Sequence, residues 1–347
     1  MQIRVSVLIP VFNGENFVGK AIASALGQTV RDIEVVVADN GSTDATWTVV
    51  MAFAFADSRV RPLRALAGQG AAFARNACLE AARGEWIAVL DADDFMLPTR
   101  LERLLAFAEQ RSAHIVADNQ RWFDADGRFL RLAWCPADIP PAVDAAHFVL
   151  ANLDSRRRAI LSYAKPMLRR SLVDAAGLRY DPTLRVGEDY QFLFLLLKAG
   201  NILHLLADEA LYGYVLTSGS LSRTLLRTDI LAWRRVNRHQ LASPGIAEPL
   251  RVALLEQRYW LGIQIAQRVF VDTLKAGRFR RTLVIVLRRP QAVPFILHFG
   301  IEALVKRIKR LRTWWPLTGG SSTARSNLPV PPASAAVADS DRVMIPR

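Results

Sequence analysis

The first third of the chain alternates short apolar runs with stretches in which apolar residues recur every three or four positions. A short apolar run suits a strand that is buried on both faces, and the second pattern is typical of an amphipathic helix. The pattern predicts five strands, at residues 3–9, 33–38, 60–66, 86–90 and 114–117. It predicts helices at 15–26, from the turn at 40–44 to about 55, at 71–82 and from 99 to about 108.

Local signals place the ends of some of these elements. Pro10 is expected to end the first strand. Thr99 and Glu102 have the spacing of a capping box, which would open the fourth helix. The regular alternation of strand and helix indicates an α/β fold, with an open, doubly wound and mostly parallel sheet that carries helices on both faces.

A rigid or acidic residue stands where each of three predicted strands ends. Pro10 follows the first strand, Asp39 the second and Asp91 the fourth. In open α/β sheets, ligands bind outside the carboxyl ends of the strands. The sequence therefore predicts a ligand site at this edge of the sheet.

Three carboxylates, those of Asp91, Asp93 and Asp94, lie within four residues of one another. Acids this close repel one another unless a cation or hydrogen-bond donors lie among them. A hard divalent cation such as Mg²⁺ or Mn²⁺ would remove the conflict, and it takes oxygen ligands together with waters and substrate phosphates. The alternative is a polar loop whose acids are solvated or cap the next helix.

Composition adds a basic surplus to this picture. The chain has 347 residues, 45 Lys and Arg against 32 Asp and Glu, and a formal net charge of +13. Such a surplus suggests nucleic acid, an anionic membrane surface or phosphorylated substrates as partners. The length suits one large domain or two small ones.

Other compositional signals exclude several classes of protein. Only Cys78 and Cys135 are present, so no disulfide framework is expected and a reducing compartment fits. Residues 3–9 are too short and too polar for a signal peptide. Since no unbroken apolar run reaches the roughly 18 residues that a spanning helix needs, none is expected.

Four segments support a family resemblance. They are residues 5–15 (VSVLIPVFNGE), 35–44 (VVVADNGSTD), 74–77 (ARNA) and 90–94 (LDADD). In this order and spacing they resemble the inverting family 2 glycosyltransferases of GT-A fold. The resemblance resumes at 165–172 and at 187–190 (GEDY), so that it covers about two thirds of the chain.

The resemblance implies a nucleotide pocket lined by Pro10 and Asp39, with Asp39 accepting a hydrogen bond from uracil N3–H. It also implies that Arg75 approaches the diphosphate. Simpler interpretations remain open: Pro10 as a strand terminator, Asp39 as the cap of its own turn, and Arg75 as an arginine on a helix surface.

The resemblance likewise implies that Asp91, Asp93 and Asp94 form the DXD motif of the family. Asp93 is the expected direct metal ligand, Asp91 lies towards the ribose or the metal, and Asp94 supports them. Asp189 would be the catalytic base, and Glu188 would orient the acceptor or the loop. The alternative for this last pair is general, because acids favour the first turn of any helix.

One stretch departs from the family pattern. Val215, Leu216 and Thr217 stand where the family often carries Arg and His before Gly-Ser, which argues against a phosphate contact there. The expected organisation is a GT-A domain at 1–225, with a nucleotide-sugar half at about 1–118 and an acceptor half at about 119–225.

A helical and basic region is expected at 226–315, and a disordered tail rich in Pro, Ala and Ser at 316–347. The basic residues of 278–312 alternate with short apolar stretches and precede Trp314 and Trp315. This pattern is typical of a helix lying in the plane of a membrane surface. A basic helical lid on the enzyme is the alternative.

The sequence thus predicts an inverting glycosyltransferase that is cytoplasmic and peripheral on the inner face of the cell membrane. Its expected donor is a UDP-sugar, its metal Mg²⁺ or Mn²⁺, and its acceptor a lipid-linked saccharide of exopolysaccharide or surface-glycan assembly. A nucleotidyltransferase is disfavoured because residues 10–15 are not a Gly-rich, basic phosphate loop. A basic nucleic-acid-binding protein is disfavoured because no nucleic-acid motif accompanies the charge.

Overall fold

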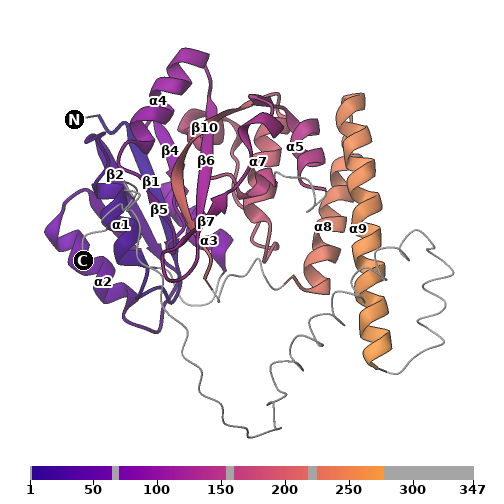
Figure 1. The fold of residues 1–347 in the computed structure, drawn as a ribbon, viewed down its shortest axis with the longest axis horizontal. Helices are drawn as coiled ribbons and strands as arrows, with labels where there is room; N and C mark the ends of the chain where they lie inside the picture. Colours follow the sequence, from indigo (N-terminus) through magenta and orange to yellow (C-terminus); the bar gives the residue numbers. More distant parts are fainter. Residues whose placement is uncertain (1, 65–69, 154–159, 218–224, 277–347) are drawn as a thin grey trace, which may run out of the picture. The chain divides into compact units, whose positions relative to one another are not determined.

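A computed structural model describes residues 2–64, 70–153, 160–217 and 225–276 (Figure 1). Within these residues, ten strands form one sheet in the order β3-β2-β1-β4-β9-β6-β10-β5, with β7 paired to β6 and β8 to β10. Helices cover both faces of the sheet, which confirms the α/β fold.

The N-terminal half of the sheet is parallel, as the sequence predicts. Strands β3, β2, β1 and β4 pair in parallel, and Val5 of β1 lies between Ile33 of β2 and Trp86 of β4. The side chains of β1, β2 and β4 are almost all buried and mostly apolar, as expected for strands covered on both faces, whereas those of the edge strand β3 are mostly half-buried. The bounds of these strands are β1 Val5–Val11, β2 Ile33–Asp39, β3 Val60–Arg64 and β4 Trp86–Val89.

The C-terminal half of the sheet is mixed. Strand β9 pairs antiparallel with both β4 and β6, whereas β6 and β10 pair in parallel. The Asp124–Gly127 stretch turns the chain from β6 into β7, with Gly127 at φ +80°. The bounds here are β5 Phe95–Met96, β6 Ile115–Phe123, β7 Phe129–Leu132, β8 Ala142–Val143, β9 Met167–Arg169 and β10 Leu203–Val215.

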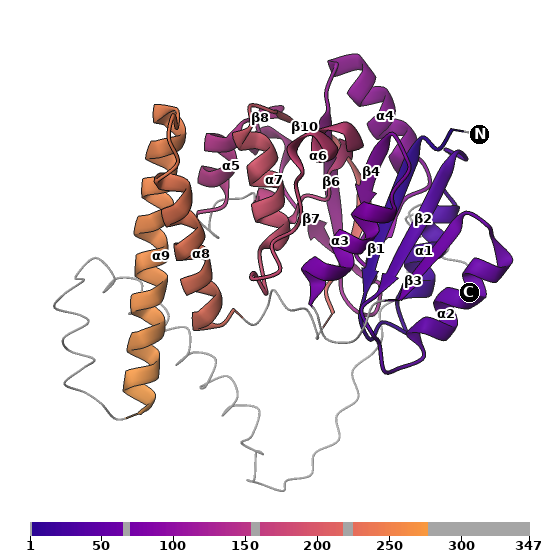
Figure 2. The same ribbon diagram turned by 180° about the vertical axis from the view of Figure 1, so that it is seen from behind.

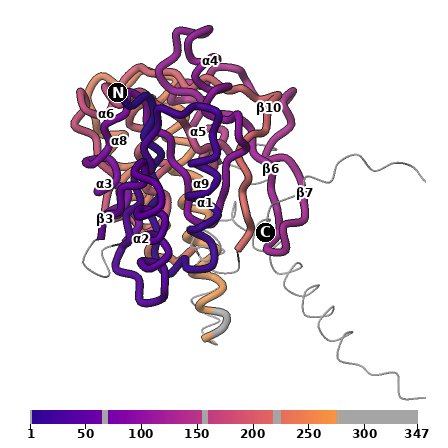
Figure 3. The backbone as a smooth tube through the Cα atoms, turned by 90° about the vertical axis from the view of Figure 1, so that its left-hand side faces the viewer, coloured from indigo at the N-terminus to yellow at the C-terminus, as the bar shows by residue number. Residues whose placement is uncertain are grey.

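Two apolar cores lie on opposite faces of the sheet. One packs against α1, α2 and α4, of which α1 and α2 lie side by side (Figure 3). The other packs against α3, α5, α6 and α7. The bounds are α1 Val18–Leu26, α2 Thr46–Ala56, α3 Ala71–Ala81, α4 Arg100–Arg111, α5 Ala145–Ala151, α6 Arg170–Ala176 and α7 Glu188–Lys198, with short 3₁₀ turns at Pro136–Asp138 and Leu161–Tyr163.

Two further helices, α8 (Arg227–Leu241) and α9 (Glu248–Lys275), pack against each other, and α9 also packs against α5. Figures 1 and 2 show them at the end of the molecule away from α1 and α2. The expected helical character of 226–315 therefore holds as far as residue 276. The rest of that region and the expected tail lie outside the described residues. No helix within the described part is long and apolar enough to cross a bilayer.

Three local expectations were wrong. Strand β1 continues through Pro10, which lies opposite Ala38 of β2. Helix α1 begins at Val18 and not at residue 15, because Glu15 bonds to the loop after β2 instead. Thr99 makes no capping hydrogen bond, and the Glu102 carboxylate accepts from the Thr29 hydroxyl at 2.7 Å.

Candidate active site

Asp39 ends β2 with a fully buried side chain. Its Oδ1 accepts from the Ser42 N–H at 2.9 Å, which is the turn-capping role. Among the described residues, its Oδ2 has no hydrogen-bond partner, and the nearest cation is the Nε of Arg64 at 3.9 Å. The carboxylate therefore caps its turn with one oxygen and leaves the other as an unfilled acceptor, which suits an N–H donor from a base.

The loops after β1 and β2 are tied together beside Asp39. The Asn13 N–H donates to Ser42 Oγ at 2.8 Å, and the Thr43 N–H donates to Asn13 Oδ1 at 2.9 Å. Pro10 lies in β1 two residues beyond Leu8, where the pairing of β1 with β4 ends. Pro10 and Asp39 thus share the carboxyl edge of the sheet, as expected.

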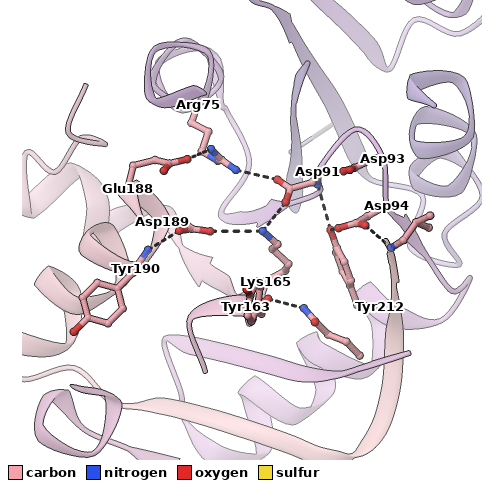
Figure 4. A network of polar contacts seen from close by, with 12 residues as sticks. Arg75, Asp91, Asp93, Asp94, Tyr163, Lys165, Glu188, Asp189, Tyr190 and Tyr212 are labelled. Carbon is pink, nitrogen blue, oxygen red and sulfur yellow. Dashed lines mark hydrogen bonds and ion pairs between the residues drawn. The ribbon is translucent and has the colours of Figure 1, made fainter. Parts of the chain in front are cut away.

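Arg75 is a buried residue of α3 and not a helix-surface arginine. Its guanidinium donates to Asp91 Oδ1 at 3.0 Å and makes a close ion pair with Glu188 (Figure 4). It therefore links the end of β4 to the first turn of α7.

Lys165 is a second buried cation, which the sequence analysis did not assign to the site. It precedes β9, and its Nζ lies 2.6 Å from Asp91 Oδ2 and 3.7 Å from Asp189 Oδ2. Its sequence signal is that the family resemblance resumes at residues 165–172, which begin with this lysine. Five side chains thus form what we call the charge chain, in the order Glu188, Arg75, Asp91, Lys165, Asp189 (Figure 4).

The three acids after β4 have different surroundings. Burial opposes ionisation of Asp91, but Lys165 and Arg75 outweigh it and lower the pKa of Asp91 to about 2. Asp94 accepts from the Tyr212 hydroxyl at 2.6 Å and from the Val215 N–H at 2.8 Å. Burial, then Asp93 and Asp91, raise the pKa of Asp94 well above its usual range. Asp94 therefore holds β10 in place.

Asp93 differs because no ion pair to it is found among the described residues. Its Oδ2 accepts from the Thr217 hydroxyl at 3.1 Å. Burial and the Asp91 carboxylate raise the pKa of Asp93. Within the part of the chain that the structure describes, no group of three or more His, Cys, Asp or Glu side chains could hold a metal. One carboxylate plus substrate phosphates is, however, a usual magnesium shell, so Asp93 fits that role.

The stretch that departs from the family pattern has a structural role here. The Val215 N–H and the Thr217 hydroxyl hold Asp94 and Asp93, respectively. Tyr212, which the sequence analysis also missed, accepts from the Asp91 N–H at 3.2 Å. Residues at and just after the end of β10 thus fix the acidic loop.

Both acids of the GEDY segment lie in the first turn of α7, as predicted. Glu188 is 6% exposed, and Arg75 holds it, so it faces the protein interior. The Asp189 side chain is 37% exposed, and its Oδ1 accepts from the Tyr190 N–H at 2.8 Å. A cavity of about 370 Å³ is lined by Asp189 together with residues of α7, α8 and α9 and residues just after α5. Asp189 is therefore the acid of this pair that can reach a bound hydroxyl.

The chain is similar to known proteins in sequence and in fold. Residues 6–175 match the family described as Glycosyl transferase family 2. The chain is 34% identical over 315 residues to the succinoglycan biosynthesis protein ExoO of Rhizobium meliloti, covering 88% of this chain and 86% of the relative. It is 32% identical over 301 residues to ExoU of the same organism, covering 84% and 85%.

A shorter match joins residues of this chain to the UDP-Glc:alpha-D-GlcNAc-diphosphoundecaprenol beta-1,3-glucosyltransferase WfaP of Escherichia coli. It is 36% identical over 105 residues, 30% of this chain and 41% of the relative. Among solved structures, S. aureus TarS 1–349 in complex with UDP-GlcNAc has a TM-score of 0.57 at 19% identity, over 78% of this chain and 72% of that one. The mannosyltransferase PcManGT from Pyrobaculum calidifontis, in complex with GDP-Man and Mn²⁺, has a TM-score of 0.55 at 17% identity, over 88% and 87%. Both likenesses support the fold.

Replacing Lys165 with Met tests the charge chain. We expect Lys165→Met to lower the free energy of unfolding by about 3–5 kcal/mol, because it leaves the buried Asp91 with Arg75 alone. Adding Asp91→Asn should recover part of that loss. The exposed Lys20 of α1 supplies a matched control, since Lys20→Met should change stability by less than about 0.5 kcal/mol. Urea denaturation measures the free energy of unfolding of all three variants. A loss for Lys165→Met as small as that for Lys20→Met would contradict the stabilising role of the charge chain.

Proposed function

We propose that this chain, which belongs to glycosyl transferase family 2, transfers a sugar from a UDP-sugar to a hydroxyl of a lipid-linked saccharide. The transfer inverts the anomeric carbon and serves the assembly of an exopolysaccharide or surface glycan. The observation that carries the proposal is the charge chain, because it joins the acidic loop after β4 to the exposed Asp189 through Lys165. ExoO and ExoU are named as succinoglycan biosynthesis proteins, and WfaP is named as a glucosyltransferase for a diphosphoundecaprenol-linked sugar, which supports this assignment.

The unfilled Oδ2 of Asp39 is the acceptor for uracil N3–H in this proposal. A uridine donor is supported by the UDP-Glc in the name of WfaP and by the UDP-GlcNAc bound to TarS. Pro10 lines the base pocket from the same edge of the sheet. Asp91, held by both cations of the charge chain, faces the ribose or diphosphate, and Arg75 adds positive charge there.

Asp93 is the proposed metal ligand, with Mg²⁺ or Mn²⁺ as the ion. The Mn²⁺ in the PcManGT complex supports this choice. Such an ion, when bound, stabilises the negative charge that develops on the β-phosphate as the sugar leaves. Asp94 keeps the loop in place through Tyr212 and Val215, so that Asp93 faces the donor phosphates.

Asp189 is the proposed general base. The proton of the attacking hydroxyl moves to the Asp189 carboxylate as the new C1–O bond forms and the bond to the β-phosphate oxygen breaks. Lys165 fixes the Oδ2 of this carboxylate. Glu188, bound to Arg75, fixes the first turn of α7 and orients the loop rather than the acceptor.

Replacing Asp189 with Asn tests the base. We expect turnover to fall by at least about a hundredfold while UDP affinity stays near normal, because a base acts in the transition state. Initial rates of sugar transfer and calorimetry with UDP measure the two quantities. The exposed Asp126, in the turn between β6 and β7, gives the control substitution Asp126→Asn. Turnover of Asp189→Asn equal to that of this control would remove Asp189 from the mechanism.

Removing the metal ligand tests the assignment of Asp93. We expect Asp93→Ala and chelation by EDTA each to abolish transfer, since the leaving diphosphate then keeps its charge uncompensated. Added Mn²⁺ or Mg²⁺ should restore the chelated wild type and leave Asp93→Ala inactive. Full wild-type activity in metal-free buffer would refute the requirement for a divalent metal.

The segment 278–312 is proposed to hold the enzyme on the inner face of the cell membrane, where a lipid-linked acceptor lies. Each basic side chain near an anionic surface contributes about 1 kcal/mol, and salt screens it. We expect a variant with Lys306, Arg307, Lys309, Arg310 and Arg312 all changed to Gln to sediment with anionic vesicles far less than the wild type. Neutral vesicles are the control, and equal sedimentation of both proteins would exclude this anchor.

A further inference from the structure

A cavity of about 370 Å³ lies beside Asp189, and its described wall is mostly apolar. Asp189 is the one charged side chain among the described residues that line it. Trp233 of α8 and Trp260 of α9 line it with aromatic surface, and Phe194 of α7 adds more. Its volume lies at the lower end of the range for small-molecule sites, about 300–1,000 Å³.

Amide side chains interrupt this apolar wall. Asn237 of α8 is 2% exposed, and its Nδ2 donates to Leu254 O and to Gln257 Oε1, both at 2.9 Å. Among the described residues, the Oδ1 of Asn237 is buried without a hydrogen-bond partner, and so is the Oε1 of Gln264. Both residues line the cavity. A buried acceptor without a donor is unfavourable, so two such oxygens at one cavity indicate a ligand with hydroxyl or N–H groups.

The amides are also connected to the base. The Gln257 Nε2 donates to the Tyr190 hydroxyl at 2.8 Å, and the Tyr190 N–H donates to Asp189 Oδ1. Tyr190 thus contacts Gln257 through its side chain and Asp189 through its backbone, and both Gln257 and Asp189 line the cavity. A ligand in the cavity would lie within reach of the carboxylate that takes the proton.

We propose that this cavity binds a neutral sugar residue of the acceptor, with Asn237 and Gln264 accepting its hydroxyls and the tryptophans packing on its faces. The proposal rests on the proposed function, and it makes α8 and α9 part of the acceptor site. A phosphate is disfavoured, because the described residues of the wall include no cation. An alkyl chain does not fit either, because it would leave both amide oxygens without donors.

Two substitutions probe the cavity in the full-length chain. Val236 of α8 is half-buried and lines it, so Val236→Trp fills its volume. Val252 of α9 is 53% exposed and does not line it, so Val252→Trp is the matched control. Asn237→Leu removes the unpaired acceptor at similar size, and serves as a second variant if Val236→Trp fails to fold.

The probes are methyl β-D-glucopyranoside, methyl β-D-galactopyranoside, glucose 1-phosphate and hexanol, and saturation-transfer NMR measures their binding. We expect at least one methyl glycoside to bind the wild type and Val252→Trp equally, and to bind Val236→Trp and Asn237→Leu about tenfold or more weakly. Glucose 1-phosphate and hexanol should not compete with it.

Glycoside binding that is equal in all four proteins would overturn the proposal, as would displacement by hexanol or no glycoside binding at all. UDP binding by the wild type, measured by calorimetry, tests the proposed function separately. A chain that binds UDP but no glycoside would thus refute the cavity assignment alone.

Discussion

The pairing of two buried cations with three acids is the constraint on which the site depends. Arg75 and Lys165 are each less than a tenth exposed, and a buried cation without a partner is strongly unfavourable. Asp91 satisfies both cations with separate oxygens, while Glu188 and Asp189 occupy the two ends. Because these side chains come from α3, the end of β4, the segment before β9 and α7, the charge chain fixes the two halves of the site against each other.

The ion pairs also give the three acids after β4 different surroundings. The oxygens of Asp91 are both taken by protein cations, and those of Asp94 by Tyr212 and Val215. Asp93 keeps coordination capacity, since its Oδ2 accepts from the Thr217 hydroxyl and no described cation pairs with it. Three acids that are nearly equivalent in the sequence thus differ in the structure: Asp91 pairs with two cations, Asp94 holds β10, and Asp93 has no ion pair among the described residues. Their neighbours come from residues 75 to 217, so local spacing does not reveal the division.

The sequence predicted well the strands and helices whose apolar residues form a clear pattern of burial. The strands at 33–38 and 86–90 and the helix at 71–82 match the structure within a residue or so, because continuous apolar runs leave few alternatives. The errors occur where a side chain bonds to a residue that is far away in the sequence. Glu102 bonds to Thr29 instead of capping its helix, and Glu15 bonds to Ala45 instead of starting one. Lys165 was missed for the same reason, since its partner Asp91 lies 74 positions earlier.

Gly187, the glycine of the GEDY segment, allows α8 to pack closely against the turn before α7. Gly187 has φ +86°, and a Cβ there would lie 2.7 Å from the indole Nε1 of Trp233. That Nε1 donates to the Val186 carbonyl at 2.7 Å, so the indole occupies the space that a side chain at 187 would need. Glycine therefore serves both the left-handed backbone before α7 and the close approach of α8. Since Asp189 follows two residues later, the contact of α8 with this turn fixes the position of Asp189 as well as part of the cavity wall beside it.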